Sequence, residues 1–328
     1  MPKVSVVMSV YNGERFLRQA VDSILAQTFT DFEFVVVDDG STDGTAEILK
    51  GYTDPRLRVI SQENIGLIGS LNRAVDIASG EYIARMDADD ISSPRRLELQ
   101  LEWLESHPHT AVLGTQVLEI GDDGHTIRRH YYPTEGAAIA KALLQGATAI
   151  CHGSAVFRRA CFQRVGGYRQ RFEHAEDYDL WLRTIESWNM ENLPHVLYQK
   201  RLTIESVSFA HFLQQQRSAA FALECARHRR DGLPEPSKAP SDSPPARREL
   251  GDYHWHLGLA YADMGDMKKA RAHFRYATAH SFRDPHIWLC YLATLLGKSF
   301  ARRALLFARS AVRFLPFLQK DSLGPFNR

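Results

Sequence analysis

Strand-like and helical segments alternate through the first 90 residues, and this alternation limits the fold more than any other feature of the chain. Apolar runs rich in β-branched residues occupy Val4–Val10, Phe32–Val37, Leu57–Ile60 and Glu81–Met86. The segments between them carry apolar residues at helical spacing. Strands and helices that alternate in this way build a parallel sheet with helices on both faces. We therefore predict an α/β fold with a mostly parallel sheet flanked by helices.

Polar turns follow three of these strands, at Tyr11–Gly13, Asp38–Thr45 and Asp87–Asp90. Ligands of such sheets bind at the carboxyl ends of the strands, so we expect the three turns to converge on one ligand. Farther along, we predict strands at Ala111–Ile120 and Ile150–Phe157 and helices at Arg95–Ser106, Arg159–Val165 and from Glu176 onward.

The turn Asp87–Asp90 carries three carboxylates, and Arg85 is the only basic residue beside it. Carboxylates two residues apart at a strand exit can project toward one point, which suits a hard divalent cation with oxygen ligands. A cation would also relieve their mutual repulsion. A solvated acidic turn that caps the next helix is the alternative interpretation of this segment.

Composition excludes several classes of protein. A chain of 328 residues exceeds one typical domain, so two domains are expected. The four cysteines form no CxxC pair, which favours a reducing compartment over a disulfide framework or a structural zinc site. We find neither a secretory signal nor an apolar run near the roughly 18 residues that span a bilayer. These features predict a cytoplasmic protein.

Charge and proline content divide the chain near residue 230. Residues 1–210 carry 21 Lys and Arg against 29 Asp and Glu, whereas residues 211–328 carry 19 against 10. Residues 231–248 hold five of the 14 prolines and are typical of an exposed linker. We predict an α/β domain over residues 1–230, a linker over 231–248 and a small helical domain over 249–328.

The predicted helical domain has the spacing of a tetratricopeptide repeat. Trp255–Tyr261 starts the pattern, and Trp288 lies 33 residues after Trp255; Ala270, Phe274, Ala277 and Pro285 continue it. One good copy and one degenerate copy fall below the roughly three repeats that are self-sufficient. A plain helical hairpin is the alternative.

Six segments of the chain form a set: Val4–Leu17, Val35–Thr45, Asn64–Pro94, His152–Arg158, Val165–Tyr168 and Glu176–Arg183. Together, and in this order, they closely resemble the family 2 glycosyltransferases, which are inverting nucleotide-sugar enzymes with a GT-A, Rossmann-like fold. The resemblance covers roughly residues 3–210 and leaves out the helical tail. It implies transfer of a sugar from a nucleotide-diphosphate donor to an acceptor hydroxyl.

The resemblance implies a nucleotide site in the first loops. Asp39 matches the carboxylate that accepts a hydrogen bond from the base, usually uracil, although it could also be a turn-forming Asp. The backbone around Val10 and Tyr11, together with Glu14, would line the base pocket. His152 could contact the acceptor or the pyrophosphate, or be a hydrogen-bonded histidine near the sheet end. UDP is favoured, while dTDP and GDP remain open.

The resemblance also assigns the acidic residues. Asp87 and Asp89 match the DxD motif, in which Asp89 would ligate Mg²⁺ or Mn²⁺. Asp87 would contact the ribose or a metal-bound water, and Ala88 between them belongs to the nucleotide-sugar site. Asp177 matches the general base of the ED motif, with Glu176 as its neighbour. Carboxylates that merely favour a helix start are the alternative for this pair.

A single base is enough for this chemistry. The bound metal makes the nucleoside diphosphate a good leaving group, and the attacking hydroxyl needs only to lose its proton. One displacement inverts the anomeric carbon. A retaining glycosidase would need two carboxylates about 5–5.5 Å apart, so a hydrolase is disfavoured.

The chain departs from the family beyond residue 200. Many relatives carry Arg-x-His before a Ser-x-Ser pair; here Arg201 is kept, Thr203 replaces the histidine, and Ser206 and Ser208 follow. Metal or diphosphate binding from that side is therefore in doubt. Gln214–Arg217 resembles part of the QxxRW motif of processive synthases but lacks the Trp, so we do not expect processive polymerisation.

We expect a role in surface polysaccharide, lipopolysaccharide or glycoprotein assembly, with a glycan, lipid-linked or protein acceptor. Basic and apolar residues alternate over Arg302–Phe314, which suits an anionic membrane surface, although a solvated helix face is the alternative. Residues 249–328 could thus contact a membrane at its inner face, or a protein. Nucleic acid is not expected. The competing hypothesis is an inactive GT-A-like scaffold, but intact Asp39, Asp87, Asp89 and Asp177 argue against it.

Overall fold

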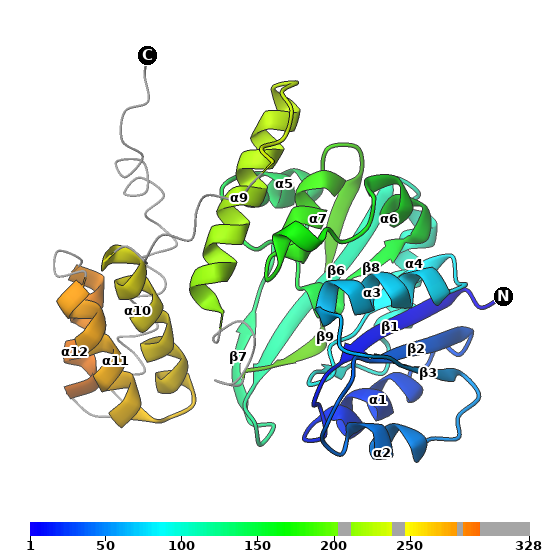
Figure 1. The fold of residues 1–328 in the computed structure, drawn as a ribbon, viewed down its shortest axis with the longest axis horizontal. Helices are drawn as coiled ribbons and strands as arrows, with labels where there is room; N and C mark the ends of the chain where they lie inside the picture. The colour runs from blue at the N-terminus through cyan, green and yellow to red at the C-terminus, as the bar shows by residue number, and fades with distance from the viewer. Residues whose placement is uncertain (203–210, 238–246, 281–284, 296–328) are drawn as a thin grey trace. The chain divides into compact units, whose positions relative to one another are not determined.

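The computed structural model describes residues 1–202, 211–237, 247–280 and 285–295. The chain divides into two compact units, Met1–Thr203 with Gln214–Pro240 and Ile204–Leu213 with Ser241–Arg328. The first unit contains a sheet with helices on both faces, and the second contains helices (Figure 1). Half of the predicted linker, residues 238–246, lies outside the described residues.

The sheet of the first unit has the strand order β3-β2-β1-β4-β8-β6-β9-β5, with β7 paired to β6. The strands in chain order are β1 Val4–Val10, β2 Phe32–Asp38, β3 Leu57–Ser61, β4 Tyr82–Arg85, β5 Ile91–Ser92, β6 Thr110–Ile120, β7 Thr126–His130, β8 Val156–Arg158 and β9 Asn189–Arg201. Strands β3, β2, β1 and β4 are parallel, as are β6 and β9. The short β8 runs antiparallel between β4 and β6. The predicted α/β fold is confirmed, and its second half is a mixed sheet.

Helices cover both faces because the buried strands alternate their side chains. In β1, Val6 and Met8 belong to one apolar core and Val7 to the other. Helices α1 (Leu17–Leu25), α2 (Thr45–Lys50) and α4 (Arg96–Ser106) pack on the first face. The second face is covered by α3 Gly66–Ile77, α5 Gly136–Leu144, α6 Arg159–Val165, α7 Glu176–Thr184 and α9 Phe212–Arg230.

One predicted strand is replaced in part by a tight turn. Residues 150–157 were expected to be extended, but His152–Ser154 form a 3₁₀ turn and β8 begins only at Val156. The turn is closed by a hydrogen bond from the Ser154 N–H to the Cys151 carbonyl. Position 153 requires glycine, because any larger side chain there would clash with Asp87 and Tyr198. Periodicity alone could not reveal this contact between distant segments.

The second unit contains α10 (Arg247–Asp263), α11 (Met267–His280) and α12 (Pro285–Leu295). Phe274 of α11 is fully buried and packs against Gly258 of α10. The helical character of this region is confirmed, whereas a tetratricopeptide assignment stays a prediction. No helix in the described ranges is long and apolar enough to cross a membrane. The predicted basic helix Arg302–Phe314 lies outside them.

Candidate active site

One edge of the sheet gathers the predicted site. The parallel strands β1, β2, β3 and β4 all end at this edge, as do β6 and β9. The antiparallel β8 starts there, so the His152–Ser154 turn lies at the same edge. The first turn of α7 contributes Glu176 and Asp177. Burial raises the pKa values of both, and the charge of the nearby Asp87 adds to the shifts. Residues from four distant parts of the chain therefore meet.

The loops after β1 and β2 are joined by a series of hydrogen bonds. Asn12, Gly13 and Glu14 each donate a backbone N–H to a side chain of the other loop: Ser41 Oγ at 2.9 Å, Thr45 Oγ1 at 2.8 Å and Asp43 Oδ2 at 3.0 Å. In return, Asn12 Oδ1 accepts from the Thr42 N–H at 2.8 Å and Glu14 Oε2 from the Gly44 N–H at 2.7 Å. Asn12 takes a left-handed backbone conformation, with φ of 52°. We call these paired loops the zipped loops.

Asp39 holds the start of α3. Its carboxylate accepts hydrogen bonds from Gln62 Nε2 at 2.7 Å and from the backbone N–H groups of Ile65 and Gly66, both at 2.9 Å. Its own N–H donates to the Val10 carbonyl at 2.9 Å. Because a carboxylate has about four lone-pair sites, this buried side chain can still accept another hydrogen bond through Oδ2. Its role toward a nucleotide base stays a prediction. The side-chain bonds within its own turn are made by Asp38, to the Ser41 N–H, and by Asp43, to the Thr45 N–H, and not by Asp39.

Asp87 is held from both sides of the acidic turn. The fully buried guanidinium of Arg85 donates to its Oδ1 at 2.7 Å and, although burial opposes ionisation, lowers the pKa of Asp87. The Asp87 N–H donates to Tyr198 Oη at 3.2 Å. Oδ2 lies over Gly153 and makes no hydrogen bond to any described residue. Ala88 lies beside Gly13, so the acidic turn adjoins the zipped loops.

Asp89 is half-buried and Asp90 is buried, and both carboxyls have raised pKa values. Burial and the neighbouring Asp87 raise the pKa of Asp89 to about 6. Burial and Asp89 raise the pKa of Asp90 well above its usual range. Arg201 fixes this pair, because its N–H donates to Asp90 Oδ1 at 2.7 Å and its Nε to the Asp89 carbonyl at 2.9 Å. Arg201 is thus a structural clamp. Thr203, Ser206 and Ser208 lie outside the described residues.

Glu176 and Asp177 open helix α7. Burial and Asp177 raise the pKa of Glu176 to about 8, and burial also raises the pKa of Asp177. Asp177 Oδ1 accepts a hydrogen bond from the Tyr178 N–H at 2.7 Å, but no side chain caps the helix, so the alternative interpretation is supported only by the place of these carboxylates in the first turn. Two adjacent carboxyls with different environments can divide the roles of acid and base.

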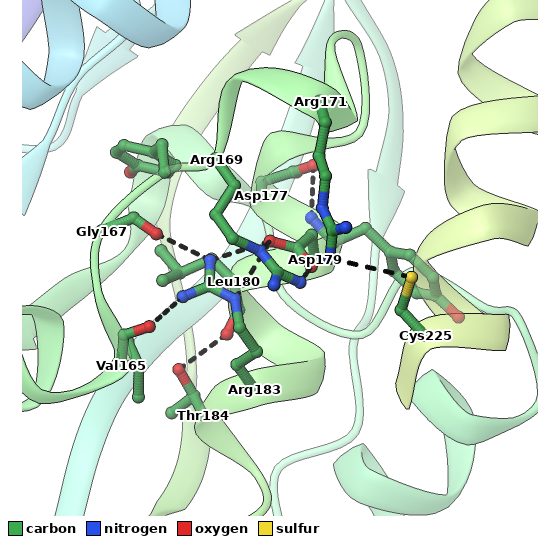
Figure 2. A network of polar contacts seen from close by, with 12 residues as sticks. Val165, Gly167, Arg169, Arg171, Asp177, Asp179, Leu180, Arg183, Thr184 and Cys225 are labelled. Atoms are coloured by element: carbon green, nitrogen blue, oxygen red, sulfur yellow. Dashed lines mark hydrogen bonds and ion pairs between the residues drawn. The ribbon is translucent and has the colours of Figure 1, made fainter. Parts of the chain in front are cut away.

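A buried ion network anchors α7 (Figure 2). Asp179 is fully buried and accepts hydrogen bonds from the guanidinium groups of Arg169 and Arg183. Arg183 also donates to the carbonyls of Gly167, at 2.7 Å, and Val165. The first turn of α7, with Asp177 beside it, is thereby held against the segment that follows α6. Such support fixes the position of a reactive carboxylate.

His152 is held inside an aromatic group. Its Nε2 lies 2.7 Å from Tyr168 Oη, and its ring makes edge contacts with Tyr168 and Trp181. Burial and Arg85 lower the pKa of His152 to about 3, so the ring is neutral at physiological pH. The structure places it beside Asp87, but these contacts match the alternative of a hydrogen-bonded histidine. Its contact with a donor stays a prediction.

Several residues of this edge were missed. Arg96 is fully buried and donates to the carbonyls of Gly153, at 2.8 Å, and Arg85, at 3.2 Å. Tyr198 and Lys200 belong to β9, a strand absent from the predicted elements. The only signal was their closeness to Arg201, together with the two-residue period that places both on one face of an extended segment.

The donor atoms suit a hard cation only in part. Among the described residues, no three His, Cys, Asp or Glu side chains are gathered so as to hold a metal ion by themselves. Asp89 and Oδ2 of Asp87 offer carboxylate oxygens, the ligand type that Mg²⁺ and Mn²⁺ take. A cation here would need further ligands from a bound molecule, as Mg²⁺ sites commonly obtain from phosphates.

Comparison with known proteins identifies the class. The sequence model of glycosyl transferase family 2 matches residues 5–166. The EpsE protein of Bacillus subtilis (strain 168), a proposed glycosyltransferase, is 39% identical over 212 residues, which are 61% of this chain and 73% of that protein.

Solved structures share the fold. S. aureus TarS 1-349 in complex with UDP-GlcNAc has a TM-score of 0.55 at 20% identity, covering 86% of this chain and 91% of that one. The mannosyltransferase PcManGT from Pyrobaculum calidifontis, in complex with GDP-Man and Mn²⁺, has a TM-score of 0.53 at 19% identity, covering 93% and 86%.

The α/β unit thus has the GT-A-like fold of nucleotide-sugar transferases. The chain belongs to glycosyl transferase family 2 and is a glycosyltransferase.

Proposed function

We propose that the chain is a metal-dependent, inverting glycosyltransferase that moves a sugar from a nucleotide-diphosphate donor to an acceptor hydroxyl. One observation carries the proposal: the acidic turn Asp87–Asp90 and the pair Glu176–Asp177 meet at one sheet edge, beside the zipped loops. Asp89, Asp90 and Glu176 have raised pKa values there, and perturbed groups of this kind gather at functional sites.

The donor would bind across the zipped loops. Tyr11 is 54% exposed at the end of β1, so its ring is free to pack on a base, and Asp39 has an unused acceptor site. The backbone at Val10 and the first turn at Glu14 would border the same pocket. The match of Asp39 supports UDP. Because the structurally similar mannosyltransferase PcManGT binds GDP-Man, GDP is also tested as the donor nucleotide.

Asp89 and Asp87 would hold the cation with oxygens of the donor diphosphate. When bound, the cation supplies charge stabilisation for the departing nucleoside diphosphate. Asp87 keeps its carboxylate ionised through Arg85. Asp89, with a pKa of about 6, is ionised at neutral pH, and its negative charge would attract the cation. Ala88, which lies beside Gly13, would border the same site.

Asp177 would act as the general base. At pH 7, Glu176 holds its proton because its pKa is about 8, which leaves Asp177 as the ionised member of the pair. Burial raises the pKa of Asp177 and strengthens it as a base. It would take the proton of the acceptor hydroxyl as that oxygen attacks the face of the anomeric carbon opposite the diphosphate. A single displacement inverts the carbon.

The acceptor and pathway remain broader proposals. Surface polysaccharide, lipopolysaccharide or glycoprotein assembly in the cytoplasm, with a glycan, lipid-linked or protein acceptor, follows from the family resemblance. Residues 249–328 would supply a protein or membrane contact, and liposome binding at rising salt tests the membrane option.

The test is isothermal titration of UDP, GDP and dTDP into the purified protein, with and without Mn²⁺. We expect one nucleotide to bind in a Mn²⁺-dependent way. Asp89→Asn should weaken that binding by at least about tenfold, since it removes a charged ligand. Asp76→Asn, a change at an exposed α3 residue, is the control. Folded protein that binds no nucleotide would contradict the proposal and favour the scaffold hypothesis.

A further inference from the structure

Strand β9 directs two side chains toward the acidic turn. Tyr198 and Lys200 are two residues apart on a strand, so they share a face. The Tyr198 hydroxyl lies against Gly153 and accepts the Asp87 N–H at 3.2 Å. Lys200 stands one pleat nearer the end of the strand, next to Arg201, whose N–H binds Asp90 at 2.7 Å. The ammonium of Lys200 therefore projects on the side of the carboxylates.

The other cations of this edge already have fixed partners. Arg85 donates to Asp87, Arg96 to two carbonyls, and Arg201 to carbonyls and to Gln19. By contrast, the Lys200 ammonium makes no ion pair or hydrogen bond with any described residue, although the backbone of Lys200 pairs with Glu119 in the sheet. Its neighbour across the strands, Glu119, is taken by Arg128 and by His130 at 3.5 Å.

Lys200 lies within electrostatic reach of the whole cluster. Lys200 is among the largest influences that lower the pKa of Asp87, Asp89, Asp90 and Asp177, which places its charge near all four carboxylates. Burial opposes its own charge, but Cys151, Asp90 and Asp87 raise the pKa of Lys200 to about 12. It therefore stays protonated and cannot exchange a proton with the reacting groups near neutral pH.

We propose that Lys200 binds the diphosphate of the donor and neutralises the nucleoside diphosphate as it departs. The proposal rests on the proposed function of the same site. The bond between the anomeric carbon and the β-phosphate oxygen breaks, and its electron pair stays on that oxygen. The acceptor oxygen forms the new bond, and its proton goes to Asp177. Lys200 supplies a positive charge that the sequence lacks where Thr203 replaces the family histidine.

The experiment compares UDP with uridine in the presence of Mn²⁺. Lys200→Met keeps the length of the side chain and removes its charge, whereas Lys200→Arg keeps the charge. Because a charge-assisted contact is lost, we expect Lys200→Met to weaken UDP binding by about 10- to 100-fold and uridine binding by less than about twofold. Lys200→Arg should restore most of the UDP affinity. Lys141→Met, at an exposed α5 position, is the matched control.

The ratio of the two affinities keeps the test independent of any change in folded fraction. Wild-type protein that binds UDP, with Lys200→Met showing an unchanged UDP-to-uridine ratio, would overturn the role of Lys200 and leave the proposed function intact. An equal loss for both ligands would overturn it as well, because the lysine would then only organise the site. If the wild-type protein binds neither UDP, GDP nor dTDP, the proposed function fails and this proposal fails with it.

Discussion

The zipped loops and the acidic cluster, which consists of the turn Asp87–Asp90 and the pair Glu176–Asp177, lie side by side at one sheet edge. They are built in opposite ways. In the zipped loops, each of Asn12, Gly13 and Glu14 donates its N–H to a side chain of the facing loop. In the acidic cluster, the half-buried Asp89 and the buried Glu176 form no ion pair with a described residue, and burial raises their pKa values to about 6 and 8. The hydrogen-bonding groups of the zipped loops are paired with one another, whereas Asp89 and Glu176 have no ion-pair partner among the described residues.

This difference separates the part of the site that gives shape from the part that reacts. Hydrogen bonds between the loops would keep the proposed nucleotide site formed before the ligand arrives, which reduces the entropy lost on binding. Buried like charges destabilise the folded protein until a ligand neutralises them, and such perturbed groups gather at functional sites. We therefore expect changes in the acidic cluster to alter activity most, and changes in the zipped loops to alter stability.

The largest effect should come from Asp177→Asn. Loss of the general base should lower kcat about 10²- to 10⁴-fold, while the affinity for the nucleotide changes by less than about threefold. Turnover of a donor identified by titration and the binding of its nucleotide are the two measurements. Asp76→Asn serves again as the control. A variant that retains full turnover would show that Asp177 is not the base, and the contrast between the regions would lose its main support.

Glu176→Gln should change the pH dependence of stability. Since the folded-state pKa of Glu176 is raised to about 8, the folded protein binds this proton more tightly than the unfolded chain does. Ionisation therefore costs stability as pH rises from about 4.5 to 8. We expect the variant to gain at least about 1.4 kcal/mol over the wild type at pH 8.5 relative to pH 5, the value of one pKa unit.

Urea unfolding without metal or nucleotide measures this difference. A parallel change of both proteins with pH would mean that Glu176 is not the strained group. Adding Mn²⁺ and the bound nucleotide should reduce the wild-type loss at high pH if the ligand relieves the cluster.

The smallest effect is expected in the zipped loops. Asn12→Gly keeps the left-handed backbone and loses the acceptor for the Thr42 N–H, which should cost about 1 kcal/mol of unfolding free energy. Asn12→Ala also forces an alanine into that backbone conformation and should cost about 1 kcal/mol more. Urea unfolding compares the two. If neither variant differs from the wild type, these hydrogen bonds do not hold the loops.

The sequence predicted the first half of the sheet well because each of its elements carries a local signal. Buried parallel strands such as Val4–Val10 are continuous apolar runs, and α6 was predicted with the observed bounds. The strands in the second half of the sheet were predicted less well. Strand β9 carries polar residues among its apolar ones and pairs with β6 through several register shifts, so its pattern is irregular.

The site divides in the same way. Asp39, Asp87, Asp89 and Asp177 stand in short motifs and could be named from their neighbours in the chain. Lys200, Arg96 and Gly153 could not, because their importance depends on contacts with residues more than 50 positions away.

What the sequence by itself determined is the α/β alternation, the family and the residue types that converge at the carboxyl ends of the strands. Local periodicity and short motifs record these, since they depend on neighbours along the chain. Only the tertiary structure decided which charges are satisfied. Burial and long-range pairing commit Arg85 to Asp87 and Arg201 to Asp90, and they leave Lys200 beside the carboxylates without an ion pair in the described chain. A charge has its chemical meaning only with its neighbours and its dielectric surroundings, and folding sets both.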